Sequence, residues 1–107
     1  MTRENSDLLV KIKRAIMSGR YRFSDKAQME MDDDDLNEMD IIESIINAVA
    51  IYKKIRSTSP YRKTSKEYLY IIQSTNLDGI FIYTKGKFTR EADEEIYYFL
   101  ISAKRAI

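Results

Sequence analysis

The sequence predicts an α+β fold in which three N-terminal helices pack on a C-terminal antiparallel sheet of three to four strands. Apolar residues recur at helical spacing in the first half of the chain. The last third holds three runs rich in aromatic and β-branched residues, at 68–74, 80–88 and 95–106, separated by turn residues. Such runs are typical of consecutive antiparallel strands. A chain of 107 residues suits one core, so a single domain over 1–107 is expected.

Two helices are expected before residue 34. The first is predicted over residues 7–18, with Asn5 or Ser6 as its N-cap and Gly19 where a helix commonly ends. Ser24 is placed to cap the second helix. The apolar positions of the two helices recur at helical spacing: Leu8, Leu9, Ile12 and Ile16 in the first, and Ala27 and Met31 in the second.

The third helix has the clearest start signal in the chain. Asn37 is a typical N-cap residue, and Asp40 follows it by three positions. Leu36 is placed to pack against Ile41 as a hydrophobic staple. The apolar stripe of this helix is wide, which predicts that it lies across the sheet and supplies much of the core. The stripe consists of Ile41, Ile42, Ile45, Ile46 and Val49.

Alternation along the strands assigns side chains to the two faces of the sheet. Phe81, Tyr83 and Lys85 share one face of the middle strand. Regular alternation in the last strand groups Ile96, Tyr98, Leu100, Ser102 and Lys104. Both faces are apolar over most of their length, which predicts a sheet covered on each side and a cationic, tyrosine-bearing edge. A short extended segment is expected at 20–23, and the apolar residues of 51–55 favour the start of a further strand.

Composition excludes several kinds of chemistry. The chain has no Cys and no His, which excludes disulfides, thiol nucleophiles, Cys/His zinc sites and histidine general bases. The acidic run 32–35 has Asn37 where a calcium loop needs Gly, so no metal is expected there. No cofactor is expected either. No stretch approaches the roughly 20 apolar residues of a membrane span, and a secretory signal is lacking. We therefore expect a cytoplasmic protein without membrane contact.

Charge is strongly segregated although the net charge is +1. Residues 1–22 hold six Lys/Arg and two acids, whereas residues 25–50 hold nine acids and Lys26 alone. Residues 53–66 hold six Lys/Arg and no acid. This pattern predicts a dipolar surface with a basic side suited to phosphate, although solvated faces without a function are the simpler alternative.

Cationic residues near tyrosines mark three candidate sites: the segment 53–66, the block 83–87 and the C-terminal run 101–105. Lysine and arginine pair with phosphates and aromatic rings stack on unpaired bases, which favours single-stranded nucleic acid. The predicted nucleic-acid-binding residues are Lys54, Arg56, Arg62, Lys63, Lys85, Lys87 and Arg105. Such a rim also suits RNA cleavage without histidine, since Lys or Tyr can activate the 2′-hydroxyl and Lys or Arg can stabilise charge on the phosphate.

The order of elements resembles the RelE/ParE superfamily of toxins, and within it the MqsR-like mRNA interferases and related small domains of unknown function. The resemblance rests on a helix, the segment SGRYRFSDKA, a helix containing Asp-Ile-Ile, and strands ending in Ile-Ser-Ala-Lys-Arg. It matches Lys53, after Ile51 and Tyr52, to a family lysine, Tyr83 to a strand tyrosine and Lys104 to the final lysine. It implies a RelE-like fold, a metal-independent endoribonuclease with these three catalytic residues, and a cognate antitoxin as partner.

Alternatives to the ribonuclease remain open. A non-catalytic interaction module can bind a protein, a nucleic acid or a second copy of the chain through its sheet, because an exposed strand edge seeks a partner. Inhibition of a DNA enzyme, as in the ParE branch, needs no cleavage chemistry. For the ribonuclease itself, the expected partner is mRNA, free or on the ribosome.

Overall fold

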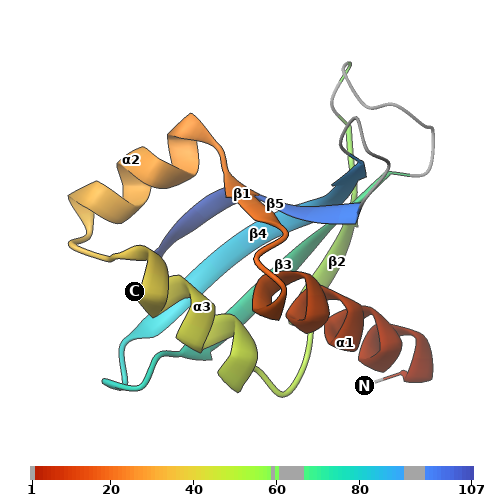
Figure 1. Cartoon of the computed structure of the whole chain (residues 1–107), viewed down its shortest axis with the longest axis horizontal. Coiled ribbons are helices and arrows are strands. Elements are labelled where there is room, and N and C mark those ends of the chain that lie inside the picture. The colour runs from red at the N-terminus through yellow and green to blue at the C-terminus, as the bar shows by residue number, and fades with distance from the viewer. Residues whose placement is uncertain (1, 59, 61–66, 91–95) are drawn as a thin grey trace.

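The computed structural model describes residues 2–58, 60, 67–90 and 96–107, and the fold is α+β (Figure 1). The predicted fold class and the three predicted helices are confirmed. The helices are α1 (Arg3–Met17), α2 (Asp25–Asp33) and α3 (Glu38–Asn47). The strands of the described residues are β1 (Tyr21–Phe23), β2 (Lys53–Arg56), β3 (Tyr68–Thr75), β4 (Phe81–Arg90) and β5 (Ile96–Arg105).

These strands form one mixed sheet in the order β1-β5-β4-β3-β2. β1 pairs in parallel with β5, and the other pairs are antiparallel. The sheet therefore differs from the expected antiparallel sheet of three to four strands. The added strands are short, three residues in β1 and four in β2, and segments of this length carry too little alternation to be counted from sequence.

The helix ends follow local capping chemistry. α1 begins earlier than predicted because its N-cap is Thr2, whose hydroxyl accepts a hydrogen bond of 3.1 Å from the Asn5 N–H, and neither Asn5 nor Ser6 caps it. Gly19 has a φ of +74° just beyond the helix, as expected for a residue that ends one. Ser24 caps α2, and Asn37 with Asp40 forms a full capping box on α3, both as predicted.

The core lies on one face of the sheet, on which α1 and α3 are packed (Figure 1). Buried side chains of the three helices form one cluster with sheet residues that include Tyr70, Ile72, Ile82, Tyr98 and Leu100. We call this side the covered face. Among the described residues the expectation of cover on each side is not met, because the helical core residues all cluster with this face.

We call the opposite side of the sheet the open face, because the core cluster of the described residues does not extend to it. Strand pairing places the following residues there: Arg22, Lys53, Ile55, Leu69, Ile71, Gln73, Phe81, Tyr83, Lys85, Lys87, Tyr97, Phe99, Ser102 and Lys104. Val49, which was expected on the apolar stripe of α3, lies beyond the end of that helix and is 89% exposed. No helix in the described part of the chain is long and apolar enough to cross a membrane.

A β-bulge in β5 changes which side chains share a face. Lys85 pairs with Ser102 and Gly86 pairs with Leu100, so Ile101 has no partner in the register. Beyond the bulge, Ser102 and Lys104 therefore face the open side, whereas Tyr98 and Leu100 face the covered side. The predicted grouping of all these residues on one face is wrong for this reason.

Candidate nucleic-acid interface

Lysines from three strands share the open face: Lys53 of β2, Lys85 of β4 and Lys104 of β5. Lys53 of β2, Lys85 of β4 and Ser102 of β5 lie in one row across the sheet, joined through Ile71 of β3. Paired residues in antiparallel strands point to the same side, so Lys53 and Lys85 share the face. Neither lysine has an ion pair or hydrogen bond with another described residue. Their charges are therefore available to an anion on this face.

Tyr83 and Lys104 form the closest pairing of predicted catalytic residues. The two residues are directly opposite in the β4–β5 register, and Lys104 Nζ lies 5.4 Å from the centroid of the Tyr83 ring. This contact depends on the bulge at Ile101, because regular alternation would place Lys104 on the other side. The structure thus brings a phenol and an ammonium together beside Lys85.

Lys53 shares the open face but not the immediate surroundings of Tyr83. Two strand spacings separate β2 from β4, which is about 10 Å between backbones. A proton-transfer group must come within about 3 Å of the reacting atom, directly or through one water. The catalytic role of Lys53 stays a prediction: the structure places it on the same face as Tyr83, two strands away.

Two predicted RNA-binding residues, Lys54 and Arg56, point to the covered side of the sheet. They pair with Tyr70 and Tyr68, which face that side. Lys54 Nζ lies 3.1 Å from Glu4 and 4.4 Å from the centroid of the Tyr68 ring. The hydrogen bond to Glu4 raises the pKa of Lys54 above its ordinary value. These two residues are consequently not part of the open face.

Arg105 is also turned away from the open face. It pairs with Ile82 of the covered face, and its Nε donates a 3.1 Å hydrogen bond to the Asp34 carbonyl. Lys87 does lie on the open face, where it forms an ion pair of 3.2 Å with Glu67. The remaining predicted residues, Arg62 and Lys63, lie outside the described residues.

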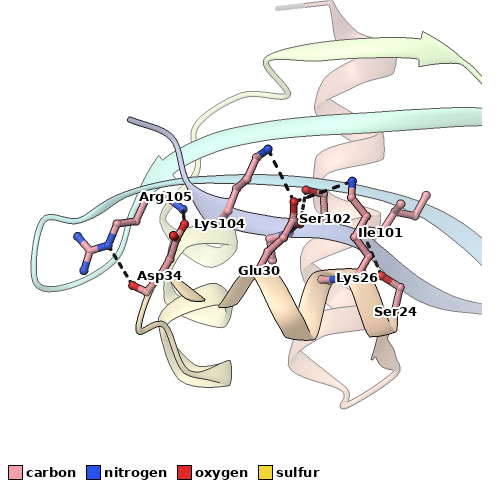
Figure 2. Close-up of polar contacts among 10 residues, drawn as sticks. Ser24, Lys26, Glu30, Asp34, Ile101, Ser102, Lys104 and Arg105 are labelled. Atoms are coloured by element: carbon pink, nitrogen blue, oxygen red, sulfur yellow. Dashed lines mark hydrogen bonds and ion pairs between the residues drawn. The ribbon is translucent and has the colours of Figure 1, made fainter. Parts of the chain in front are cut away.

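Sequence reasoning missed Glu30, which joins α2 to the open face (Figure 2). One carboxylate oxygen accepts hydrogen bonds from the Ser102 hydroxyl at 2.6 Å and the Ala103 N–H at 3.2 Å. The other lies 3.7 Å from Lys104 Nζ and 3.9 Å from Lys26 Nζ. A lone glutamate in an acidic helix carries no sequence signal for such contacts, since they depend on how α2 lies against β5.

Charge and burial act in opposite directions on Glu30, whose side chain is 19% exposed. Burial by itself raises the pKa of this carboxyl group. The hydrogen bonds from Ser102 and Ala103, with the positive charges of Lys26 and Lys104, outweigh burial and lower the pKa of Glu30 below its ordinary value. Glu30 is therefore ionised at neutral pH, as an ion pair with Lys104 requires.

α2 also covers the free edge of β5 beyond β1. The Ser24 N–H and hydroxyl donate to the carbonyls of Leu100 and Ile101. Carboxylates of Glu30 and Asp34 accept from the Ala103 and Arg105 N–H groups, as Figure 2 shows in part. The Ser24 N–H and three side chains thus pair with backbone groups of β5 that would otherwise be open to a neighbouring strand, which protects the edge.

The arrangement suits a polyanion better than a metal ion. Within the described ranges no group of three or more acidic residues could hold a metal ion. Lysine ammonium groups suit phosphates as point charges. Three partly buried rings lie on the same face: Tyr83 is in contact with Lys104, the Arg22 guanidinium lies 4.5 Å from the centroid of the Tyr97 ring, and Phe99 adds an aromatic ring of the kind on which bases stack.

Comparison with known proteins gives no match: no protein-family model, no curated protein and no solved structure resembles this chain significantly. Inferences about function therefore depend on the placement of its own side chains.

Proposed function

We propose that the open face binds single-stranded RNA and that Tyr83 and Lys104 on this face cleave it, as the resemblance to RelE-like and MqsR-like toxins implies. One observation carries the proposal: Lys53, Lys85 and the Tyr83–Lys104 pair lie on the same face of the sheet, which the helical core leaves open. Lysines at different positions across a sheet suit successive phosphates of an extended strand, and the rings between them suit its bases.

The cleavage step uses the 2′-hydroxyl of the RNA as its nucleophile. The 2′-oxygen loses its proton and attacks the adjacent phosphorus, the bond from phosphorus to the 5′-oxygen breaks, and the 5′-oxygen takes up a proton. The products are a 2′,3′-cyclic phosphate and a 5′-hydroxyl. In this proposal Tyr83 and Lys104 are the groups that move these protons or stabilise the charge on the phosphate. Lys53 and Lys85 hold the flanking phosphates.

The binding half of the proposal is tested by fluorescence anisotropy with a labelled single-stranded RNA. The variant K53A/K85A removes two charges from the open face. The matched control K11A/K54A removes two charges from residues that contact Phe88 and Tyr68 on the covered side. We expect the first variant to bind at least about tenfold more weakly and the slope of log K against log salt to fall by about 1.4, at about 0.7 for each lost phosphate contact. Equal loss in both variants would contradict a specific face.

The cleavage half is tested with purified protein, several RNAs and ribosomes. We expect Lys104→Ala to lose cleavage by at least about a hundredfold, as for the loss of a general acid or base. Tyr83→Phe keeps the ring and removes the phenol, so it reports on proton transfer separately from stacking. Cleavage by Lys104→Ala at the wild-type rate, or no cleavage by the wild type on any of these RNAs, would refute the enzyme.

A protein partner on the open face is the second candidate. Ile55 and Leu69 on that face are apolar and only half-buried, and exposed apolar surface can mark a protein contact. The cognate antitoxin and a homodimer both belong to this candidate. An apolar interface is little affected by salt, whereas RNA binding weakens steeply as salt rises. Sedimentation and anisotropy measured over a salt series therefore distinguish the two.

A further inference from the structure

We infer that Glu30 is a positioning residue that holds Lys104 beside Tyr83. The effect on RNA cleavage rests on the proposed function. The contacts that hold Lys104 belong to the protein without RNA and can be tested there. The sequence places Glu30 in an acidic helix, 74 positions from Lys104. The structure places its carboxylate directly between α2 and the C-terminal end of β5 (Figure 2).

The two oxygens of Glu30 have different tasks. Oε1 is fixed by two donors of β5, the Ser102 hydroxyl at 2.6 Å and the Ala103 N–H at 3.2 Å. Oε2 is left to face the lysines, 3.7 Å from Lys104 Nζ. Because the donors to Oε1 belong to the residues directly before Lys104, the carboxylate cannot shift along β5 without losing them. The ammonium is therefore drawn toward a fixed point.

Lys104 needs such a fixed point because its own side chain is long and 46% exposed. A free lysine side chain of this kind samples many rotamers, and holding it in one of them costs conformational entropy. The contact with Tyr83 at 5.4 Å is weak on its own, since a cation–π contact at an exposed site is largely screened by water. An anchored carboxylate on one side and a ring on the other restrict Lys104 together.

Removal of the charge alone is the sharpest test. Glu30→Gln keeps an oxygen that can accept from Ser102 and Ala103, but it replaces the negative charge facing Lys104 with a neutral amide. Lys26→Ala is the matched control, because it removes the other lysine near Oε2 and leaves Glu30 and Lys104 in place. The Lys26 side chain is 61% exposed. Ser102→Ala removes the shorter of the two hydrogen bonds to Oε1 and keeps the charge, so it is a second variant should Glu30→Gln fold poorly.

The first readout needs no RNA. In the wild type, Tyr83 lies beside the end of Lys104, so its ring current shifts the Lys104 side-chain NMR resonances away from those of a solvated lysine. We expect these resonances to move toward the solvated values in Glu30→Gln and Ser102→Ala and to stay unchanged in Lys26→Ala. Unchanged Lys104 resonances in folded Glu30→Gln would overturn the inference, whatever the protein does to RNA.

The second readout separates positioning from simple charge. Loss of a carboxylate from a basic face strengthens RNA binding if it has any effect on affinity, since a repulsive charge disappears. We therefore expect Glu30→Gln to bind RNA as tightly as the wild type or more tightly, yet to cleave it about tenfold to a hundredfold more slowly in single turnover, the cost of a misplaced group. Unchanged cleavage in Glu30→Gln together with slow cleavage in Lys104→Ala would overturn positioning and leave the proposed function intact.

Discussion

Lys53 and Lys54 are neighbours in β2, yet they face opposite sides of the sheet and have different surroundings. Lys54 points to the covered face, where it meets Glu4 and the Tyr68 ring. Lys53 points to the open face and has no charged partner among the described residues. The comparison shows that a basic segment of sequence does not define a basic surface, because strand alternation divides its charges between the two faces.

The two faces also differ in what their side chains contribute to stability. On the covered face, side chains such as Ile72 and Ile82 are fully buried in the core cluster. On the open face, Gln73, Tyr83 and Lys85 are only partly buried. We therefore expect substitutions on the covered face to change the free energy of unfolding and substitutions of these partly buried open-face residues, unlike the buried Ile71 and Ser102, to change binding. The predictions below test this division, from the largest effect to the smallest.

Ile72→Ala is expected to have the largest effect. Ile72 is 0% exposed and belongs to the core beneath α1 and α3. Truncation of a buried isoleucine to alanine leaves a cavity, so we expect a loss of about 2–5 kcal/mol in the free energy of unfolding. The neighbouring Gln73→Ala on the open face should cost less than about 0.5 kcal/mol. Urea denaturation of both variants measures the difference, and similar losses would mean that the open face also packs in the folded protein.

Gly86→Ala is expected to follow in size. A Cβ at Gly86 would lie 2.5 Å from Cζ of Tyr98, a buried ring that cannot move aside easily. Overpacking of this kind costs about 1–3 kcal/mol, and the urea midpoint should fall accordingly. The double variant Gly86→Ala/Tyr98→Leu removes the ring that clashes. If the double variant loses as much unfolding free energy as the two single variants together, the clash with Tyr98 is not the cause of the loss in Gly86→Ala.

Tyr98→Phe tests a buried hydroxyl on the covered face. The Tyr98 side chain is 0% exposed, and its hydroxyl has no hydrogen-bond partner among the described residues. Burial also raises the pKa of Tyr98 far above its ordinary value. Removal of an unsatisfied buried group should stabilise the protein by about 1 kcal/mol in thermal or urea unfolding. A loss of stability would show that the hydroxyl is paired in solution. Tyr83→Phe on the open face should change stability by less than about 0.5 kcal/mol.

Local signals in the sequence were enough to predict the helix starts at Ser24 and Asn37 and the fold class. The capping signals act over three or four residues, and α2 and α3 begin where these signals predict. The faces of β5 could not be predicted, because one unpaired residue, Ile101, reverses the alternation for Ser102 and Lys104. A bulge is set by how strands pair across the sheet. The run Ile-Ser-Ala-Lys at 101–104 contains no Gly or Pro that would indicate a bulge from sequence.

The sequence was enough to predict the residue types of the candidate site, but only some of the predicted residues lie on the open face. Five residues predicted from the sequence share the open face: Lys53, Tyr83, Lys85, Lys87 and Lys104. Lys54, Arg56 and Arg105 do not, since alternation and the contact with Asp34 turn them away. Glu30 was not nominated, because its role arises from the contact of α2 with β5, which no spacing within α2 encodes.

The pH dependence of stability is expected to show the smallest effect and concerns Glu30, the residue that connects α2 with the open face. The pKa of Glu30 in the folded protein is lower than its ordinary value of 4.5, so the unfolded chain binds its proton more tightly than the folded protein does. Stability therefore rises with pH through this range. The contribution of Glu30 is fully present above pH 4.5 and is lost as the pH falls through the folded pKa.

We accordingly expect the difference in unfolding free energy between the wild type and Glu30→Gln to be constant near neutral pH and to shrink below pH 4.5. Ser102→Ala removes one of the hydrogen bonds that lower the pKa of Glu30, so its stability should vary less with pH over the same range. Urea titrations of the three proteins at a series of pH values measure both effects. A wild-type advantage over Glu30→Gln that grows on acidification would reverse the sign and mean that burial, which raises the pKa, outweighs the hydrogen bonds and lysines around this carboxylate.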